Sequence, residues 1–99
     1  MKSLEEIKTA LIEHKQIFFE QFHVTKIGIF GSYIRQEQTE DSDLDILVEF
    51  EPNAQFGLFT FCKLENYMTE IAGVKVDLVM KDNLKPKIGQ EILSQVVYI

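Results

Sequence analysis

Two aspartates separated by one residue, Asp43 and Asp45, are the side chains of this sequence best placed to do chemistry. They begin the segment DLDILVEF (43–50), whose β-branched and large apolar residues predict a strand. Residues i and i+2 of a strand point to the same face, so both carboxylates project together while Leu44 and Ile46 face the core. Adjacent carboxylates repel, and one takes up a proton unless a cation lies between them. Because Mg²⁺ prefers carboxylate and phosphate oxygens, the pair predicts a metal platform for a nucleotide.

Gly31 and Ser32 predict a phosphate-binding turn. They follow the predicted strand 25–30, and a short helix over 32–38 is expected to follow them. Glycine lets the backbone approach a ligand closely, the serine adds a hydroxyl donor, and the first N–H groups of the helix favour an anion. Arg35 lies in this helix and is expected either to neutralise a phosphate or, equally, to pair with a neighbouring acid.

Asp77 is the third acidic residue of interest, because it lies in the middle of the apolar segment VKVDLVM (74–80). A charge at such a position is unfavourable unless it is paired or bound. If this strand neighbours the second one, Asp77 completes a cluster of three carboxylates, helps to hold a metal ion and assists deprotonation of an attacking hydroxyl. The alternative is a surface-facing residue of an edge strand.

The elements that must position these residues alternate between helix and strand. Ser3 and Glu6 have the spacing of a capping box, so a first helix is expected to begin there. Gly73 is expected to end the third helix, and Cys62 to lie in its core. The predicted order is α-β-α-β-α-β-α in one domain over 1–99, with helices at 3–22, 32–38, 57–71 and 84–96 and strands at 25–30, 43–50 and 74–80.

This order predicts an α/β (α+β) fold, a small mixed sheet of about three strands packed against helices. The connection 34–41 is short for a parallel crossover, so the first two strands are expected to be antiparallel. That arrangement brings Gly31 beside Asp43. A full helix joins the second and third strands, which are therefore expected to be parallel.

Charge and composition exclude several classes of function. The net charge is −6, with 10 basic against 16 acidic residues, and segment 37–51 has acidic residues but no basic one. Direct binding of duplex nucleic acid is therefore not expected. No apolar run approaches the roughly 20 residues that span a membrane. Cys62 is the single cysteine, which excludes an internal disulfide, and a cytoplasmic location is the simplest expectation.

Two motifs together resemble a known family. GSYIR (31–35), followed by SDLDI (42–46) and later by Asp77, resembles the signature of the DNA polymerase β-like nucleotidyltransferase superfamily, and the whole chain resembles its minimal nucleotidyltransferases (MNT domains). The resemblance implies two Mg²⁺ ions held by Asp43, Asp45 and Asp77, and ATP as the substrate. It also implies that Gly31 and Ser32 grip the terminal phosphates while a hydroxyl attacks the α-phosphorus.

The resemblance also implies a biological role. Stand-alone MNT proteins act as antitoxins beside HEPN toxins, and such antitoxins are similar to protein adenylyltransferases that place AMP on a tyrosine of the toxin. A HEPN-type toxin in a hetero-oligomer is therefore the expected partner. Two alternatives stay open: an inert antitoxin that acts by binding alone, and a nucleotidyltransferase for small molecules or RNA ends. Short length and acidic charge argue against the latter.

Overall fold

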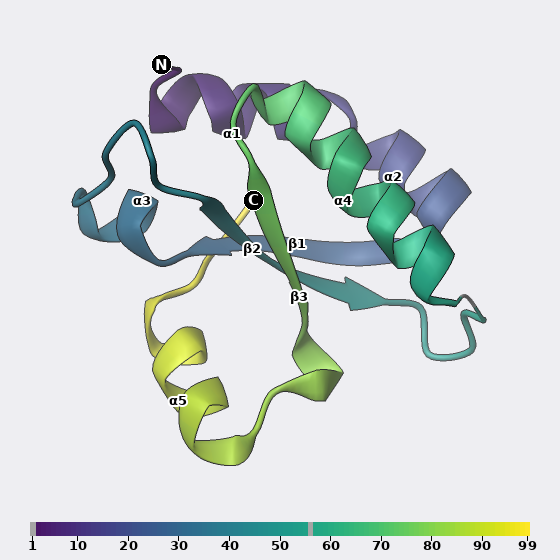
Figure 1. Ribbon diagram of the computed structural model, residues 1–99. Helices are drawn as coiled ribbons and strands as arrows, with labels where there is room; N and C mark the ends of the chain where they lie inside the picture. Colours follow the sequence, from purple (N-terminus) through teal and green to yellow (C-terminus); the bar gives the residue numbers. More distant parts are fainter. Residues whose placement is uncertain (1, 56) are drawn as a thin grey trace.

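The computed structural model describes residues 2–55 and 57–99 and has a mixed α+β fold, which confirms the predicted class (Figure 1). Its elements in chain order are α1 (Leu4–Glu13), α2 (Lys15–Phe22), β1 (Val24–Phe30), α3 (Ser32–Arg35), β2 (Leu44–Phe50), α4 (Leu58–Ala72), β3 (Val76–Met80), the 3-10 helix η1 (Lys81–Asn83), α5 (Pro86–Gln95) and β4 (Val97–Tyr98). Among the helices of the described ranges, none is both long enough and apolar enough to cross a membrane.

The sheet has four strands in the order β3-β2-β1-β4. β1 and β2 are antiparallel and β2 and β3 are parallel, so both predicted pairings are confirmed. The fourth strand was not predicted; it is two residues long and pairs antiparallel with β1, where Tyr98 lies opposite Gly28. A Cβ at Gly28 would overlap Cγ2 of Val96, so the absence of a side chain there lets the C-terminal segment lie against β1.

The main core lies between one face of the sheet and helices α1, α2 and α4, whereas α5 lies on the opposite side (Figure 1). Alternate residues of β2 face these three helices, which is the pattern of a strand with one face in the core. This core contains Ile7, Leu11, Phe18, Phe22, Leu44, Ile46, Val48, Leu64, Met68, Ala72, Val76 and Leu78. The face opposite this core carries Asp45 and Asp77, and the predicted site therefore belongs to it.

The helix predicted over 3–22 is two helices, α1 and α2, which meet at His14. Ser3 and Glu6 form the predicted capping box at the start of α1. At His14 the backbone leaves the helical conformation (φ −105°, ψ 7°), and the ring Nδ1–H donates to the carbonyl of Ala10 at 2.8 Å. The ring also packs edge-on against Tyr67 of α4, at 6.1 Å between centroids. The break thus lets α2 change direction and follow the core.

Helix α4 ends at Gly73 as predicted, where the backbone is left-handed (φ 74°). The prediction for Cys62 is wrong, because this thiol is exposed. The buried side of α4 is formed by Leu64, Met68 and Ala72, which are spaced four residues apart. Cys62 comes two residues before Leu64 and therefore lies on the opposite side of the helix.

Candidate active site

The structure brings two of the three predicted aspartates side by side. Asp45 on β2 lies in register with Asp77 on the parallel neighbour β3, and with Phe30 on the antiparallel neighbour β1. Residues in register on neighbouring strands share a face of the sheet, so both carboxylates project from the face opposite the main core. Asp43 immediately precedes β2, two residues before Asp45. We call Asp43, Asp45 and Asp77 the aspartate cluster.

The cluster is electrostatically strained at Asp45. Partial burial of this carboxyl raises its pKa from 3.8 to about 6, with further contributions from the negative charges of Asp77 and then Asp43, while Arg35 acts in the opposite direction. The charged form of Asp45 is therefore disfavoured by its neighbours. A cation among the three carboxylates would relieve that repulsion.

Gly31 brings the backbone directly against the aspartate cluster. Its conformation (φ 81°, ψ −151°) is one that essentially only glycine adopts. A Cβ at this position would overlap Oδ2 of Asp45 and lie 3.0 Å from its Cγ. The turn formed by Gly31 and Ser32, which we call the glycine–serine turn, therefore lies next to the carboxylate only because residue 31 has no side chain.

The helix after this turn is shorter than predicted. α3 spans Ser32–Arg35 instead of 32–38, and it ends at Gln36 in a left-handed conformation (φ 60°). The carbonyl of Gly31 accepts the N–H groups of Ile34 and Arg35, both at 3.1 Å. The first N–H groups of any helix have no acceptor within it. A helix of one turn has only a small dipole, so it contributes little to anion binding by itself. The glycine–serine turn must therefore bind a phosphate through hydrogen bonds, and Ser32 supplies its N–H and its hydroxyl as donors.

Arg35 pairs with a neighbouring acid, which was one of its two expected roles. Its Nε donates to Oε2 of Glu37 at 3.3 Å, in an exposed ion pair. Its Nη1 donates to Oε1 of Gln95 at 3.0 Å, and the same oxygen accepts the backbone N–H of Gly31 at 3.2 Å. Sequence reasoning missed Gln95, because no local pattern links it to a turn about 60 residues earlier.

Two side chains of α4 hold the outer edge of β3, the strand that carries Asp77. Oε2 of Glu65 accepts the N–H of Leu78 at 3.0 Å, and Oγ1 of Thr69 accepts the N–H of Val76 at 3.0 Å. Val76 and Leu78 are the neighbours of Asp77 in the sequence. The helix therefore supplies the hydrogen bonds that a further strand would otherwise supply, and it fixes the backbone on both sides of the aspartate.

Replacing Glu65 by leucine is expected to lower the free energy of unfolding by about 1–2 kcal/mol, because the N–H of Leu78 loses its acceptor. Glu65→Gln keeps an acceptor oxygen and is expected to lose less than half of that. Urea denaturation measures the effect, and Glu70→Leu, at an exposed position of the same helix, is the matched control. Equal losses for the Glu65→Leu and Glu70→Leu variants would contradict this role.

The donor chemistry of the aspartate cluster fits Mg²⁺. Over residues 2–55 and 57–99, no group of three or more His, Cys, Asp or Glu side chains is arranged so that it could by itself hold a metal ion. Mg²⁺ is commonly held by one or two carboxylates together with water and substrate phosphates, and does not need a complete protein cage. Neighbouring carboxylates beside a phosphate-binding turn are the part of such a site that a protein supplies.

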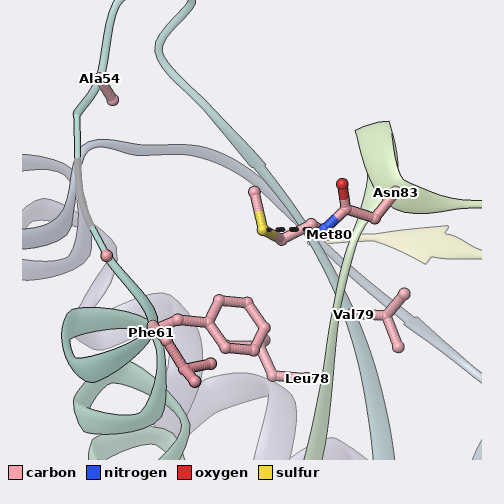
Figure 2. Close-up of a pocket in the computed structure, with 8 residues that line it drawn as sticks. Ala54, Phe61, Leu78, Val79, Met80 and Asn83 are labelled. Carbon is pink, nitrogen blue, oxygen red and sulfur yellow. Dashed lines mark hydrogen bonds between the residues drawn. The ribbon is translucent and has the colours of Figure 1, made fainter.

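A separate pocket of about 550 Å³ lies between the start of α4 and the end of β3 (Figure 2). Phe61 and Leu78 form part of its apolar lining, and the side-chain amide of Asn83 donates to the sulfur of Met80 at its rim. The lining contains no carboxylate, histidine or cysteine, and it includes no residue of the aspartate cluster or the glycine–serine turn. The chemistry of group transfer is therefore expected at the cluster and not in this pocket.

Comparison with known proteins agrees with this fold. Residues 11–99 match the model of the nucleotidyltransferase domain family. The chain therefore belongs to that family, and it is an enzyme of the nucleotidyltransferase class. Over 99 residues it is 48% identical to protein adenylyltransferase MntA from Thermococcus cleftensis, covering 100% of this chain and 98% of the relative.

Solved structures share the fold. A toxin–antitoxin structure with AMP-PNP aligns with a TM-score of 0.74 at 21% identity, covering 92% of this chain and 70% of the other. A tri-AMPylated Shewanella oneidensis HEPN toxin in complex with an MNT antitoxin contains a chain that aligns with a TM-score of 0.68 at 18% identity, covering 95% and 69%. At these identities the structures establish the architecture.

Proposed function

We propose that this chain is a Mg²⁺-dependent protein adenylyltransferase that moves AMP from ATP to a tyrosine hydroxyl of a HEPN-type toxin, and so acts as its antitoxin. The proposal is supported by 48% identity to an MntA protein adenylyltransferase and by the common fold with an MNT antitoxin bound to an AMPylated HEPN toxin. The single observation that carries it is the register of Asp45 with Asp77 beside the backbone of Gly31.

In the proposed reaction, a few residues each have a separate role. Ser32 binds the terminal phosphates of ATP through its N–H and hydroxyl, and Arg35 adds positive charge. The tyrosine oxygen attacks the α-phosphorus in line, the new P–O bond replaces the bond to the β-phosphate oxygen, and pyrophosphate leaves. Asp77 assists removal of the hydroxyl proton. We expect two Mg²⁺ ions. Held by the aspartate cluster, they would neutralise the triphosphate and the charge that develops during transfer.

The direct test is transfer of label from α-phosphate-labelled ATP to the cognate HEPN toxin. Wild-type protein with Mg²⁺ is expected to label the toxin, and mass spectrometry is expected to find AMP on a tyrosine. The Asp43→Asn/Asp45→Asn double variant should lose the labelling. Asp41→Asn, an exposed residue of the same acidic segment, serves as the control and should label like wild type.

The alternatives give different results in the same assay. If the double variant still neutralises the toxin while transferring nothing, and the wild type also transfers nothing, the protein acts by binding alone. Transfer to a small molecule or an RNA end, without transfer to the toxin, would replace the proposed substrate class.

The reaction is expected to slow as pH falls through about 6, because Asp45 must lose its proton before its carboxylate can bind a cation and the pKa of this group is about 6. Protons and Mg²⁺ then compete for the same carboxylate. Raising the Mg²⁺ concentration should therefore rescue the rate below this pH more than above it. Initial rates measured over a range of pH values and Mg²⁺ concentrations test this prediction. If the fall in rate below about pH 6 were the same at every Mg²⁺ concentration, the prediction would be contradicted.

A further inference from the structure

Gln95, the last residue of α5, joins two parts of the candidate site. Its Oε1 accepts the backbone N–H of Gly31 at 3.2 Å and Nη1 of Arg35 at 3.0 Å, while its Nε2 donates to the carbonyl of Glu91 at 3.4 Å. Since both groups that face Oε1 are donors, the amide must present its oxygen to the glycine–serine turn. One side chain thus connects the C-terminal helix, the turn and the end of α3.

This contact decides where the guanidinium of Arg35 rests. The other partner of Arg35 is Glu37, in a pair whose side chains are 47% and 64% exposed. Exposed ion pairs hold a long side chain only weakly. The shorter hydrogen bond to Gln95 gives the charged guanidinium a second partner. Without Gln95, the hydrogen bond to Glu37 would be the one that Arg35 keeps among the side-chain hydrogen bonds of the described residues.

The peptide groups on both sides of Gly31 are held by hydrogen bonds, and Gln95 supplies one of them. The Gly31 N–H is bound by Gln95, and the Gly31 carbonyl accepts the N–H groups of Ile34 and Arg35. The turn is therefore held before any ligand arrives, and its remaining donors at Ser32 point from a fixed backbone. Preorganised donors bind an anion more tightly than mobile ones, because less motion is lost on binding.

We propose that Gln95 is a positioning residue for the nucleotide: it holds Gly31 and Arg35 in the arrangement that receives the triphosphate of ATP. The identity of this ligand rests on the proposed function. Gln95 acts through Arg35 and the turn. Loss of its amide should weaken nucleotide binding and leave the chemical step nearly unchanged.

The variant Gln95→Met keeps the length of the side chain and removes its hydrogen bonds. It is expected to weaken binding of the Mg²⁺ complex of a non-hydrolysable ATP analogue about five- to tenfold, and to raise the KM for ATP similarly with less than about a twofold change in kcat. Gln90→Met, at an exposed position of the same helix, should bind like wild type. In an Arg35→Met background, Gln95→Met should weaken binding less than it does in the wild-type background, because part of its effect passes through Arg35 and the part that passes through Gly31 remains.

A second readout needs no nucleotide. Hydrogen exchange of the Gly31 amide, followed by NMR, is expected to accelerate about tenfold in Gln95→Met and to stay slow in Gln95→Glu, which keeps an acceptor oxygen. If the wild type binds the analogue but transfers nothing to the toxin, the proposed function fails, and the Gln95→Met affinity still decides the positioning role.

Four results would overturn the proposal. The first is unchanged exchange of the Gly31 amide in Gln95→Met. The second is an equal change of affinity in the Gln95→Met and Gln90→Met variants. The third is full additivity of Gln95→Met with Arg35→Met. The fourth is tighter nucleotide binding by Gln95→Met, which would mean that the amide blocks the turn instead of shaping it.

Discussion

Replacing Asp45 by asparagine is expected to reduce nucleotidyl transfer by about 10³-fold or more, while the metal-free protein becomes more stable. Asp45 has the central position of the aspartate cluster, in register with Asp77 and against the backbone of Gly31. Removing one carboxylate that helps to hold the cation removes several kcal/mol of charge stabilisation from the transition state, and about 4 kcal/mol corresponds to 10³-fold in rate.

The gain in stability follows from the raised pKa of Asp45. The unfolded chain ionises this carboxyl at about its ordinary value of 3.8, whereas the folded protein retains the proton up to about 6. Folded protein therefore holds more protons between these two values, and the free energy of unfolding falls as pH rises through that window. Because solvent reaches part of the group, we expect the loss to be about 1 kcal/mol and not the roughly 3 kcal/mol of a fully shielded one.

Thermal denaturation in the presence of EDTA tests this expectation. Asp45→Asn should have a higher Tm than wild type above about pH 7, and the difference should vanish toward pH 4, where both side chains are uncharged. Asp41→Asn should show neither effect. An asparagine variant that is less stable than wild type at neutral pH would contradict the claim that the cluster is under repulsion.

Replacing Gly31 by alanine is expected to abolish transfer and also to destabilise the fold by about 2–4 kcal/mol. The conformation at Gly31 disfavours any side chain by about 1–3 kcal/mol. In addition, the new Cβ would overlap Oδ2 of Asp45 and displace this carboxylate. Gly57→Ala is the matched control, because a Cβ at Gly57 would meet open space and its φ is −100°.

A second substitution, at Asp45, separates the effect of the steric overlap from that of the backbone conformation at residue 31. In Gly31→Ala/Asp45→Gly the overlap is gone, so part of the lost stability should return while transfer stays absent. Urea denaturation and the labelling assay give both quantities on the same samples. Full activity in Gly31→Ala, or a loss of stability no larger than in Gly57→Ala, would contradict the close approach of turn and carboxylate.

The sheet pairings were predictable from the sequence because local rules determine them, whereas Gly31 was expected beside Asp43 and lies against Asp45 instead. The short connection after Ile34 required β1 and β2 to be antiparallel, and the full helix before β3 allowed a parallel pair. Given those pairings, the alternation of strand side chains places Asp45 and Asp77 on one face. The catalytic roles of these residues remain predictions.

Other features depend on contacts between distant segments, which no local pattern contains. The break at His14 has no proline or glycine to signal it and depends on packing against Tyr67. β4 is two residues long, too short for a periodic pattern, and it exists because β1 offers a free edge beside Gly28. The contact of Gln95 with Gly31 follows from that unpredicted pairing.

The central claim is that Asp77 and the pair Asp43 and Asp45 hold one cation-bound nucleotide together. Calorimetric titration with a non-hydrolysable ATP analogue, with and without Mg²⁺, tests it most directly. We predict that wild type and Asp41→Asn bind only with Mg²⁺, and that Asp77→Asn binds at least about tenfold more weakly, which is about 1.4 kcal/mol. Binding by Asp77→Asn equal to that of wild type, or wild-type binding that is indifferent to Mg²⁺, would contradict the claim.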